Sequence, residues 1–129
     1  MKKEITTTSL SVGKFIFNRL SEELADNVTA IHPVSAPETT LPCITYRRNN
    51  FSAVGAKTGR SADTVKVEVV CHDATHTGSI NLAERVRHAL EGVSGFVDGV
   101  NVRSCVLADS SEDRSADAYL QKLFFEIKC

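Results

Sequence analysis

The chain has 129 residues, of which 42% are hydrophobic, 24% are charged and 6% are aromatic. Fifteen basic residues nearly balance sixteen acidic ones, and the formal net charge of −1 argues against a dedicated nucleic-acid binder. The length suits a single domain, 1–129, whose core needs no metal or disulfide. The longest apolar runs fall far short of the roughly 18 residues that a membrane span requires, so we expect no membrane protein.

Residues 1–9 are expected to form an N-terminal arm, and they lack the continuous apolar stretch of a secretory signal. The four cysteines contain no C-x-x-C pair, which indicates neither a zinc site nor a disulfide framework. Cysteines inside apolar runs are typical of a reducing compartment, so the sequence predicts a cytoplasmic, non-secreted protein.

The first periodic segment runs from Ser11 to Leu24 with an apolar residue at every fourth position, which predicts an amphipathic helix. Ser9 or Ser11 is expected to cap its start. All three prolines fall between residues 33 and 42 and predict an irregular connector, which leads into a strand over residues 43–48.

Residues 49–63 are rich in Asn, Ser, Ala and Gly and have no apolar period, so the sequence predicts a long flexible loop. Such a loop is either a binding element or a simple hairpin tip. Thr64 to His72 then alternates apolar and polar residues, as a half-buried strand does. Thr75 to Val93 returns to the helical period and is followed by glycine.

Two further strands are predicted, Val100 to Leu107 after the turn signal Asp98-Gly99, and Tyr119 to Lys128, and they should pair as a hairpin. The order helix, strand, strand, helix, strand, strand predicts an α+β fold with a mainly antiparallel four-stranded sheet and two helices on one face. The predicted core consists of Val12, Ile16, Leu20, Val67, Val69, Val86, Leu90, Leu123, Phe125 and Ile127.

No combination of residues indicates catalysis or a bound cofactor. Alternation places Cys71 and His72 on opposite faces of a strand, and the pair His72 and His76 lacks a third metal ligand. Lys57 follows Ala rather than the Gly of a phosphate-binding loop, and Ser94 follows a helix rather than the strand that a hydrolase nucleophile needs. We therefore expect no enzyme, no metal and no cofactor.

Charge is distributed unevenly along this nearly neutral chain. Residues 46–66 carry a net charge of +4, and residues 108–117 carry −3. The two regions are either solvated turns or complementary surfaces for a head-to-tail contact between copies, which closes into a ring when the rotation permits. On the second interpretation the interface residues are Arg47, Arg48, Lys57 and Arg60 on one side and Asp109, Glu112 and Asp113 on the other.

Four stretches carry a family resemblance. They are Ile16-Phe17-Asn18-Arg19-Leu20-Ser21 in the first helix, Leu41-Pro42-Cys43-Ile44-Thr45-Tyr46 leading into a strand, the alternating valines 65, 67 and 69, and Ala83-Glu84-Arg85-Val86-Arg87-His88-Ala89-Leu90-Glu91-Gly92. In this order and spacing the chain resembles the tail-completion, or tail-terminator, proteins of long-tailed bacteriophages and prophages.

The resemblance implies a structural virion protein that forms a ring, expected to be hexameric, at the head-proximal end of the tail. Its implied partners are further copies of itself, the tail-tube protein and the head–tail connector protein, with DNA only as a possible contact in the lumen. It would be located in the host cytoplasm during assembly and then in the virion tail. The alternative hypothesis is a small α+β binding or regulatory module for a metabolite or a protein partner.

Overall fold

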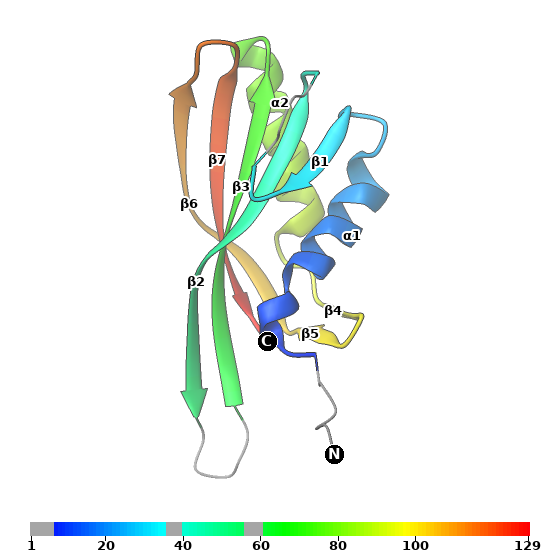
Figure 1. Cartoon of the computed structure of the whole chain (residues 1–129), viewed down its shortest axis with the longest axis vertical. Coiled ribbons are helices and arrows are strands. Elements are labelled where there is room, and N and C mark those ends of the chain that lie inside the picture. Colours follow the sequence, from blue (N-terminus) through cyan, green and yellow to red (C-terminus); the bar gives the residue numbers. More distant parts are fainter. Residues whose placement is uncertain (1–6, 36–39, 56–60) are drawn as a thin grey trace, which may run out of the picture.

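The computed structural model describes residues 7–35, 40–55 and 61–129. Figure 1 shows an elongated molecule in which a twisted sheet carries both helices on one side. The elements are the 3-10 helix η1 (Ser9–Ser11), α1 (Gly13–Leu24), β1 (Ala30–Pro33), β2 (Cys43–Gly55), β3 (Ser61–Asp73), α2 (His76–Leu90), β4 (Gly95–Val97), β5 (Val100–Val102), β6 (Ser104–Arg114) and β7 (Tyr119–Lys128).

The main sheet has five strands in the order β1-β2-β3-β7-β6. The predicted antiparallel set of four is present, but β1 adds a fifth strand that runs parallel to β2, so the sheet is mixed and the predicted strand number was wrong. β1 was missed because its four residues show no clear alternation and end in Pro33. Proline is tolerated there because β1 lies at the sheet edge, where an N–H donor is dispensable.

The loop predicted over residues 49–63 was wrong for most of its length. β2 continues to Gly55 and pairs with β3 from Ser61 onward, with a register shift between Arg48 and Asn50. Phe51 still packs against the core opposite Val65, and beyond it the backbone pairing continues over small and polar residues. Residues 56–60, which include Lys57 and Arg60, lie outside the described residues.

The run predicted as one strand over residues 100–107 divides into β5 and β6. β5 pairs with β4 in a separate two-stranded sheet, and the Asp98-Gly99 turn connects these two short strands. Both turn residues have positive φ, 48° and 87°, which is the conformation of the tight hairpin turn that Asx-Gly sequences favour. The predicted pairing of the last two strands is confirmed, since β6 and β7 form an antiparallel hairpin.

The helices begin and end close to the predicted residues. Thr8, rather than Ser9 or Ser11, caps the first helical turn, and its hydroxyl accepts a hydrogen bond from the Leu10 amide. Thr75 caps α2 by accepting from the Gly78 amide, which satisfies a donor that the helix itself leaves unpaired. α1 and α2 pack against each other and cover the same side of the sheet.

The core lies between the two helices and the covered face of the sheet. All ten residues predicted for it are at most 6% exposed, which confirms that prediction. Phe15, Ile44, Val65, Leu82 and Cys105 join them in the same cluster. The opposite face of the sheet carries the residues that alternate with the core positions, among them Arg47, Lys66 and Lys122.

Candidate interaction surfaces

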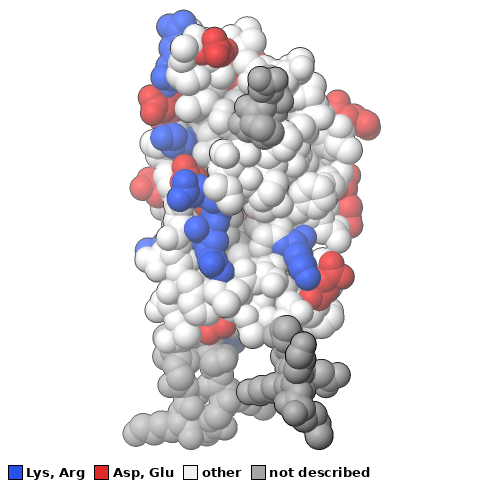
Figure 2. Space-filling view, viewed as in Figure 1, with Lys and Arg blue, Asp and Glu red and all other residues white. Residues whose placement is uncertain are grey.

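The basic residues do not form one patch in the described part of the chain. Arg47 and Arg48 are neighbours in β2 and therefore point to opposite faces of the sheet. Arg47 is exposed and is paired in register with Glu68, whereas the Arg48 guanidinium donates to the Leu10 carbonyl at 3.0 Å. Figure 2 shows basic side chains in a column over the strands, with acidic side chains among them.

The acidic residues all lie on β6 but also differ in their contacts. Glu112 accepts hydrogen bonds from Gln121 at 3.0 Å and His76 at 2.9 Å, and these two bonds lower the pKa of its carboxyl group. Asp113 accepts from the backbone amide of Arg114 and lies 3.5 Å from the Lys122 ammonium, which lowers its pKa as well.

The acidic strand and the extended β2–β3 hairpin reach toward opposite ends of the molecule. In Figure 1 the turn between β6 and β7 lies at the top, and the far end of β2 and β3 lies at the bottom, beyond the end of β7. The register agrees, because Thr64 is paired with Lys128 near the end of β7 and Ser61 to Asp63 extend beyond it. The charged residues themselves are not separated in this way. Arg47 and Asp109 lie at the same level of the sheet, because the register connects them through Glu68 and Phe124.

A small network anchors the acidic hairpin to the start of α2. The His76 ring meets the Tyr119 ring edge-on with 5.7 Å between centroids, and the Arg114 guanidinium lies 4.9 Å above the same tyrosine ring. Gln121 donates to Ser79 as well as to Glu112. No pattern in the sequence indicated this network, because its contacts join α2 to β6 and β7, which are far apart along the chain.

A second group of contacts holds β6 against the segment that follows α2. Glu91 accepts from the Arg87 guanidinium at 2.9 Å and from the Leu107 amide at 3.1 Å, and both bonds lower the pKa of its carboxyl group. The Gly92 amide donates to the Cys105 carbonyl at 2.7 Å. Glu91 was not among the predicted interface residues.

The described surface also has shallow hollows and some exposed apolar side chains. The largest hollow that we describe, about 460 Å³, lies beside α1 and is lined by residues that include Lys14, Phe17 and Asp98. Phe17 is 44% exposed, and Phe96 on β4 is 71% exposed. Another hollow of about 250 Å³ lies over β7 between Lys66 and Asp109.

The residues considered for catalysis are kept apart by the fold. Cys71 is buried in the core, where burial raises the pKa of its thiol. His72 lies on the other face, shares a 3.0 Å hydrogen bond with the Thr45 hydroxyl, and has a pKa lowered by partial burial. Within the residues that the structure describes, no three His, Cys, Asp or Glu side chains gather as a metal site would require.

None of the helices in the described ranges is long and apolar enough to cross a membrane. The fold and its surfaces define a small α+β protein with charged strand edges and a long projecting hairpin, features that suit a structural assembly protein. The comparisons with known proteins identify its family. Residues 16–129 match the family described as "Tail completion protein gp17", and the chain belongs to this family.

Tail completion proteins are structural phage tail proteins and not a class of enzymes, so the resemblance predicted from the sequence is confirmed. A chain of a solved structure titled "Virion of native gene transfer agent (GTA) particle" is similar, with a TM-score of 0.68 and 15% sequence identity. The match covers 88% of this chain and 90% of that chain, and at this identity it shows a shared fold. No curated protein matches the chain.

Proposed function

We propose that the chain forms a ring, hexameric in the finished tail, at the head-proximal end of a phage tail. There it ends polymerisation of the tail-tube protein and presents a surface to the head–tail connector protein. The observation that carries this proposal is the family match over residues 16–129. Assembly takes place in the host cytoplasm before the protein enters the virion, and DNA meets the ring only in its lumen.

We further propose that oppositely charged surfaces guide the copies together. Arg47, Arg48, Lys57 and Arg60 contribute to one interface, and Asp109, Glu112 and Asp113 contribute to the opposing surface or to the lumen. Among the described residues, Arg47 lies on β2 beyond the part that β1 covers, and the acidic residues lie on β6 at the other edge of the sheet, which supports a head-to-tail contact rather than a self-complementary one. Charges at an interface rim act mainly on the rate of encounter and on salt sensitivity.

Two experiments test this function. Phage or prophage particles lacking the gene should contain tails of uncontrolled length that do not join heads, and the intact gene supplied in trans should restore normal particles. The purified chain, measured by light scattering with the tail-tube protein, should form a complex of defined mass. Normal head-joined tails without the gene, or a chain that remains monomeric with both tube and connector proteins, would refute the proposal.

A charge-reversal series tests the interface. Arg47→Glu, alone and with Lys57→Glu and Arg60→Glu, should slow assembly most strongly at low salt. Lys14→Glu is the matched control for Arg47→Glu. Lys14 is exposed on α1, and its substitution changes the net charge by the same amount away from the proposed contact. Equal assembly rates for all variants at every ionic strength would remove the electrostatic part of the proposal.

A further inference from the structure

β6 is an edge strand of eleven residues, and in the described part of the chain no strand pairs with its outer side. An exposed strand edge presents backbone N–H and C=O groups that readily pair with a strand of another molecule. Alternate residues of an antiparallel strand direct these groups away from the partner strand. The contacts of those outward groups decide whether β6 is open to a further strand.

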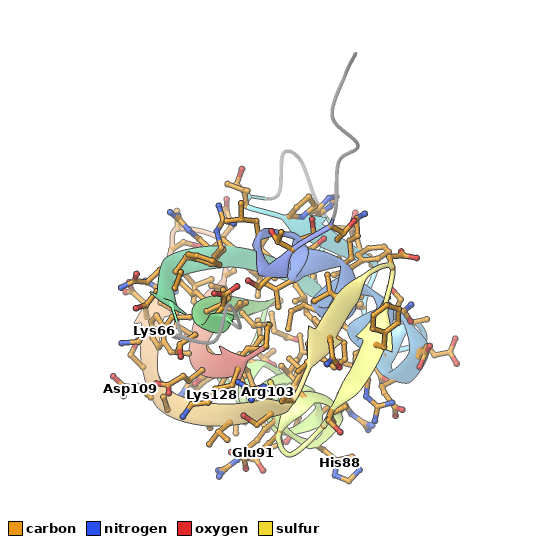
Figure 3. All side chains as sticks on the ribbon, turned by 90° about the horizontal axis from the view of Figure 1, so that it is seen from below. Lys66, His88, Glu91, Arg103, Asp109 and Lys128 are labelled. Atoms are coloured by element: carbon orange, nitrogen blue, oxygen red, sulfur yellow. The ribbon has the colours of Figure 1, made fainter. Side chains whose placement is uncertain are left out.

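The first half of this edge is covered by the chain itself. The Cys105 carbonyl accepts from the Gly92 amide, and the Leu107 amide donates to the Glu91 carboxylate, so both groups face away from β7. Glu91 is held in place by Arg87. Figure 3 shows Glu91 on the outer side of the β6 ribbon, next to α2. Strand addition at this half would require the segment after α2 to move.

The second half of the edge follows a bulge at Ala108 and is closed differently. The Ser110 amide donates to the Asp109 carboxylate, and the Arg114 amide donates to the Asp113 carboxylate, each at 2.8 Å. These donors therefore also face away from β7. Both aspartates are exposed, and Figure 3 shows Asp109 at the outer side of β6. Two surface carboxylates therefore occupy two of the three outward amide donors here, those of Ser110 and Arg114, and no chain segment among the described residues covers them.

A second copy of this chain offers a strand that fits this edge. β1 covers β2 only from Cys43 to Tyr46, and in the described ranges no strand pairs with the outer side of β2 from Arg47 onward. The strand pairings make β6 run opposite to β2, so a sheet continued from one copy to the next would pair them antiparallel. The exposed Arg47 is positive, whereas this half of β6 is acidic, so the charges are complementary.

We propose that the second half of β6 is a strand-addition edge for β2 of a second copy, and that Asp109 and Asp113 close it in the isolated chain by occupying the outward amide donors of Ser110 and Arg114. The inference deepens the proposed ring, on which it rests for its biological setting. It gives two aspartates a role in holding copies apart before assembly. A neighbouring strand must displace these carboxylates before its carbonyl groups can accept from the same amides.

The test compares two double variants of the full chain. Asp109→Ala with Asp113→Ala removes both acceptors, whereas Asp109→Asn with Asp113→Asn removes the charge and keeps an oxygen that accepts from the same amide. Light scattering across protein concentration, in salt high enough to screen the attraction between Arg47 and the aspartates, should show the alanine pair associating at about tenfold lower concentration than the wild-type chain, as expected for one net hydrogen bond. The asparagine pair should remain close to wild type.

Hydrogen exchange identifies the edges involved. The associated alanine pair should gain protection in β6 and in the β2 residues beyond Tyr46, with α1 unchanged as an internal reference. Association no stronger than that of the wild type would overturn the inference, and so would protection of β6 without β2. Circular dichroism verifies folding, and the single variants Asp109→Ala and Asp113→Ala replace the pair if it does not fold.

The outcomes also separate this inference from the proposed function. If the wild-type chain fails to assemble on the tail tube while the alanine pair associates through β6 and β2, the proposed tail function is rejected. The inference that the aspartates close the edge of β6 is then still supported. If the wild-type chain assembles on the tube while the alanine pair behaves as wild type in isolation, only the role of the aspartates is rejected.

Discussion

The turn between β4 and β5 provides a sharp test of how backbone conformation and packing combine in this protein. Gly99 has φ of 87°, in the left-handed region, and a Cβ atom added there would lie 2.7 Å from the Cβ of Thr7. Gly92, after α2, has a similar φ of 77°, but an added Cβ would meet no atom within 4 Å. The two glycines therefore share the conformational strain and differ in the steric clash.

The magnitudes follow from these two terms. A residue with a Cβ in the left-handed region costs about 1 to 2 kcal/mol, and this should be the whole effect of Gly92→Ala. Gly99→Ala adds the clash with Thr7, and crowding of a packed site costs a further ~1 to 3 kcal/mol. Gly99→Ala should therefore lower the free energy of unfolding by about 2 to 5 kcal/mol, clearly more than Gly92→Ala.

Urea unfolding followed by circular dichroism measures both variants against the wild-type chain. The denaturant midpoint should fall in the order wild type, Gly92→Ala, Gly99→Ala, with an unchanged slope. The double variant Gly99→Ala with Thr7→Gly removes the Cβ that the new alanine would meet. It should therefore regain the stability lost to the steric clash and keep only the loss due to the backbone conformation. Equal losses for the two alanine variants would show that the segment at Thr7 moves aside at no cost, and would refute the packing argument.

Three further predictions concern local contacts. Thr75→Ala should cost about 1 kcal/mol in urea unfolding because the Gly78 amide loses its capping acceptor, whereas Thr75→Ser should retain most of the stability. The pKa of Glu112 is lower in the folded chain than its ordinary value of 4.5, so the stability that this carboxylate contributes is present above pH 4.5 and is lost as the pH falls through the folded pKa. Glu112→Gln should remove this pH dependence from the urea midpoints measured between pH 7 and 3. Burial raises the pKa of Cys105 to about 12, so iodoacetamide at pH 8 should modify the partly exposed Cys129 well before Cys105, as read by peptide mass spectrometry, and equal rates would contradict the burial.

The helices, the core, β3 and β7 were predictable because their patterns reflect burial, whereas β6 beyond Leu107 is exposed and was not predicted. Val65, Val67 and Val69 alternate because one face of β3 is covered by helices, and the period of α2 records the same contact from the other side. β1 and the outer part of β2 have no comparable burial pattern. Their backbone pairing depends on strands that are distant in sequence, and small polar residues form no pattern that predicts it.

The candidate interface was predicted from a count of charges, and such a count does not show which face of the sheet each charged side chain lies on. Arg47 and Arg48 contribute equally to the count, yet alternation sends one to the open face and the other toward the Leu10 carbonyl. Asp109 and Asp113 similarly count as negative surface, yet each accepts a hydrogen bond from the amide of the next residue. The local strand geometry therefore decides what each charge can bind.

Charged residues that already bind a backbone amide and charged residues that do not should contribute differently to assembly. A carboxylate that caps a backbone amide through one oxygen can meet a cation through the other, as Asp113 does with Lys122. A strand that is added to this edge instead replaces the carboxylate at the amide, so part of the gain from strand pairing is offset by the cap that is lost. Arg47 has no such bond to release among the contacts of the described residues, and its neutralisation to Gln avoids the like-charge pair that a reversal would create with Glu68 opposite it. Arg47→Gln should therefore alter the association rate with little change in stability, whereas alteration of Asp109 or Asp113 should alter the state of the isolated chain before any partner is added.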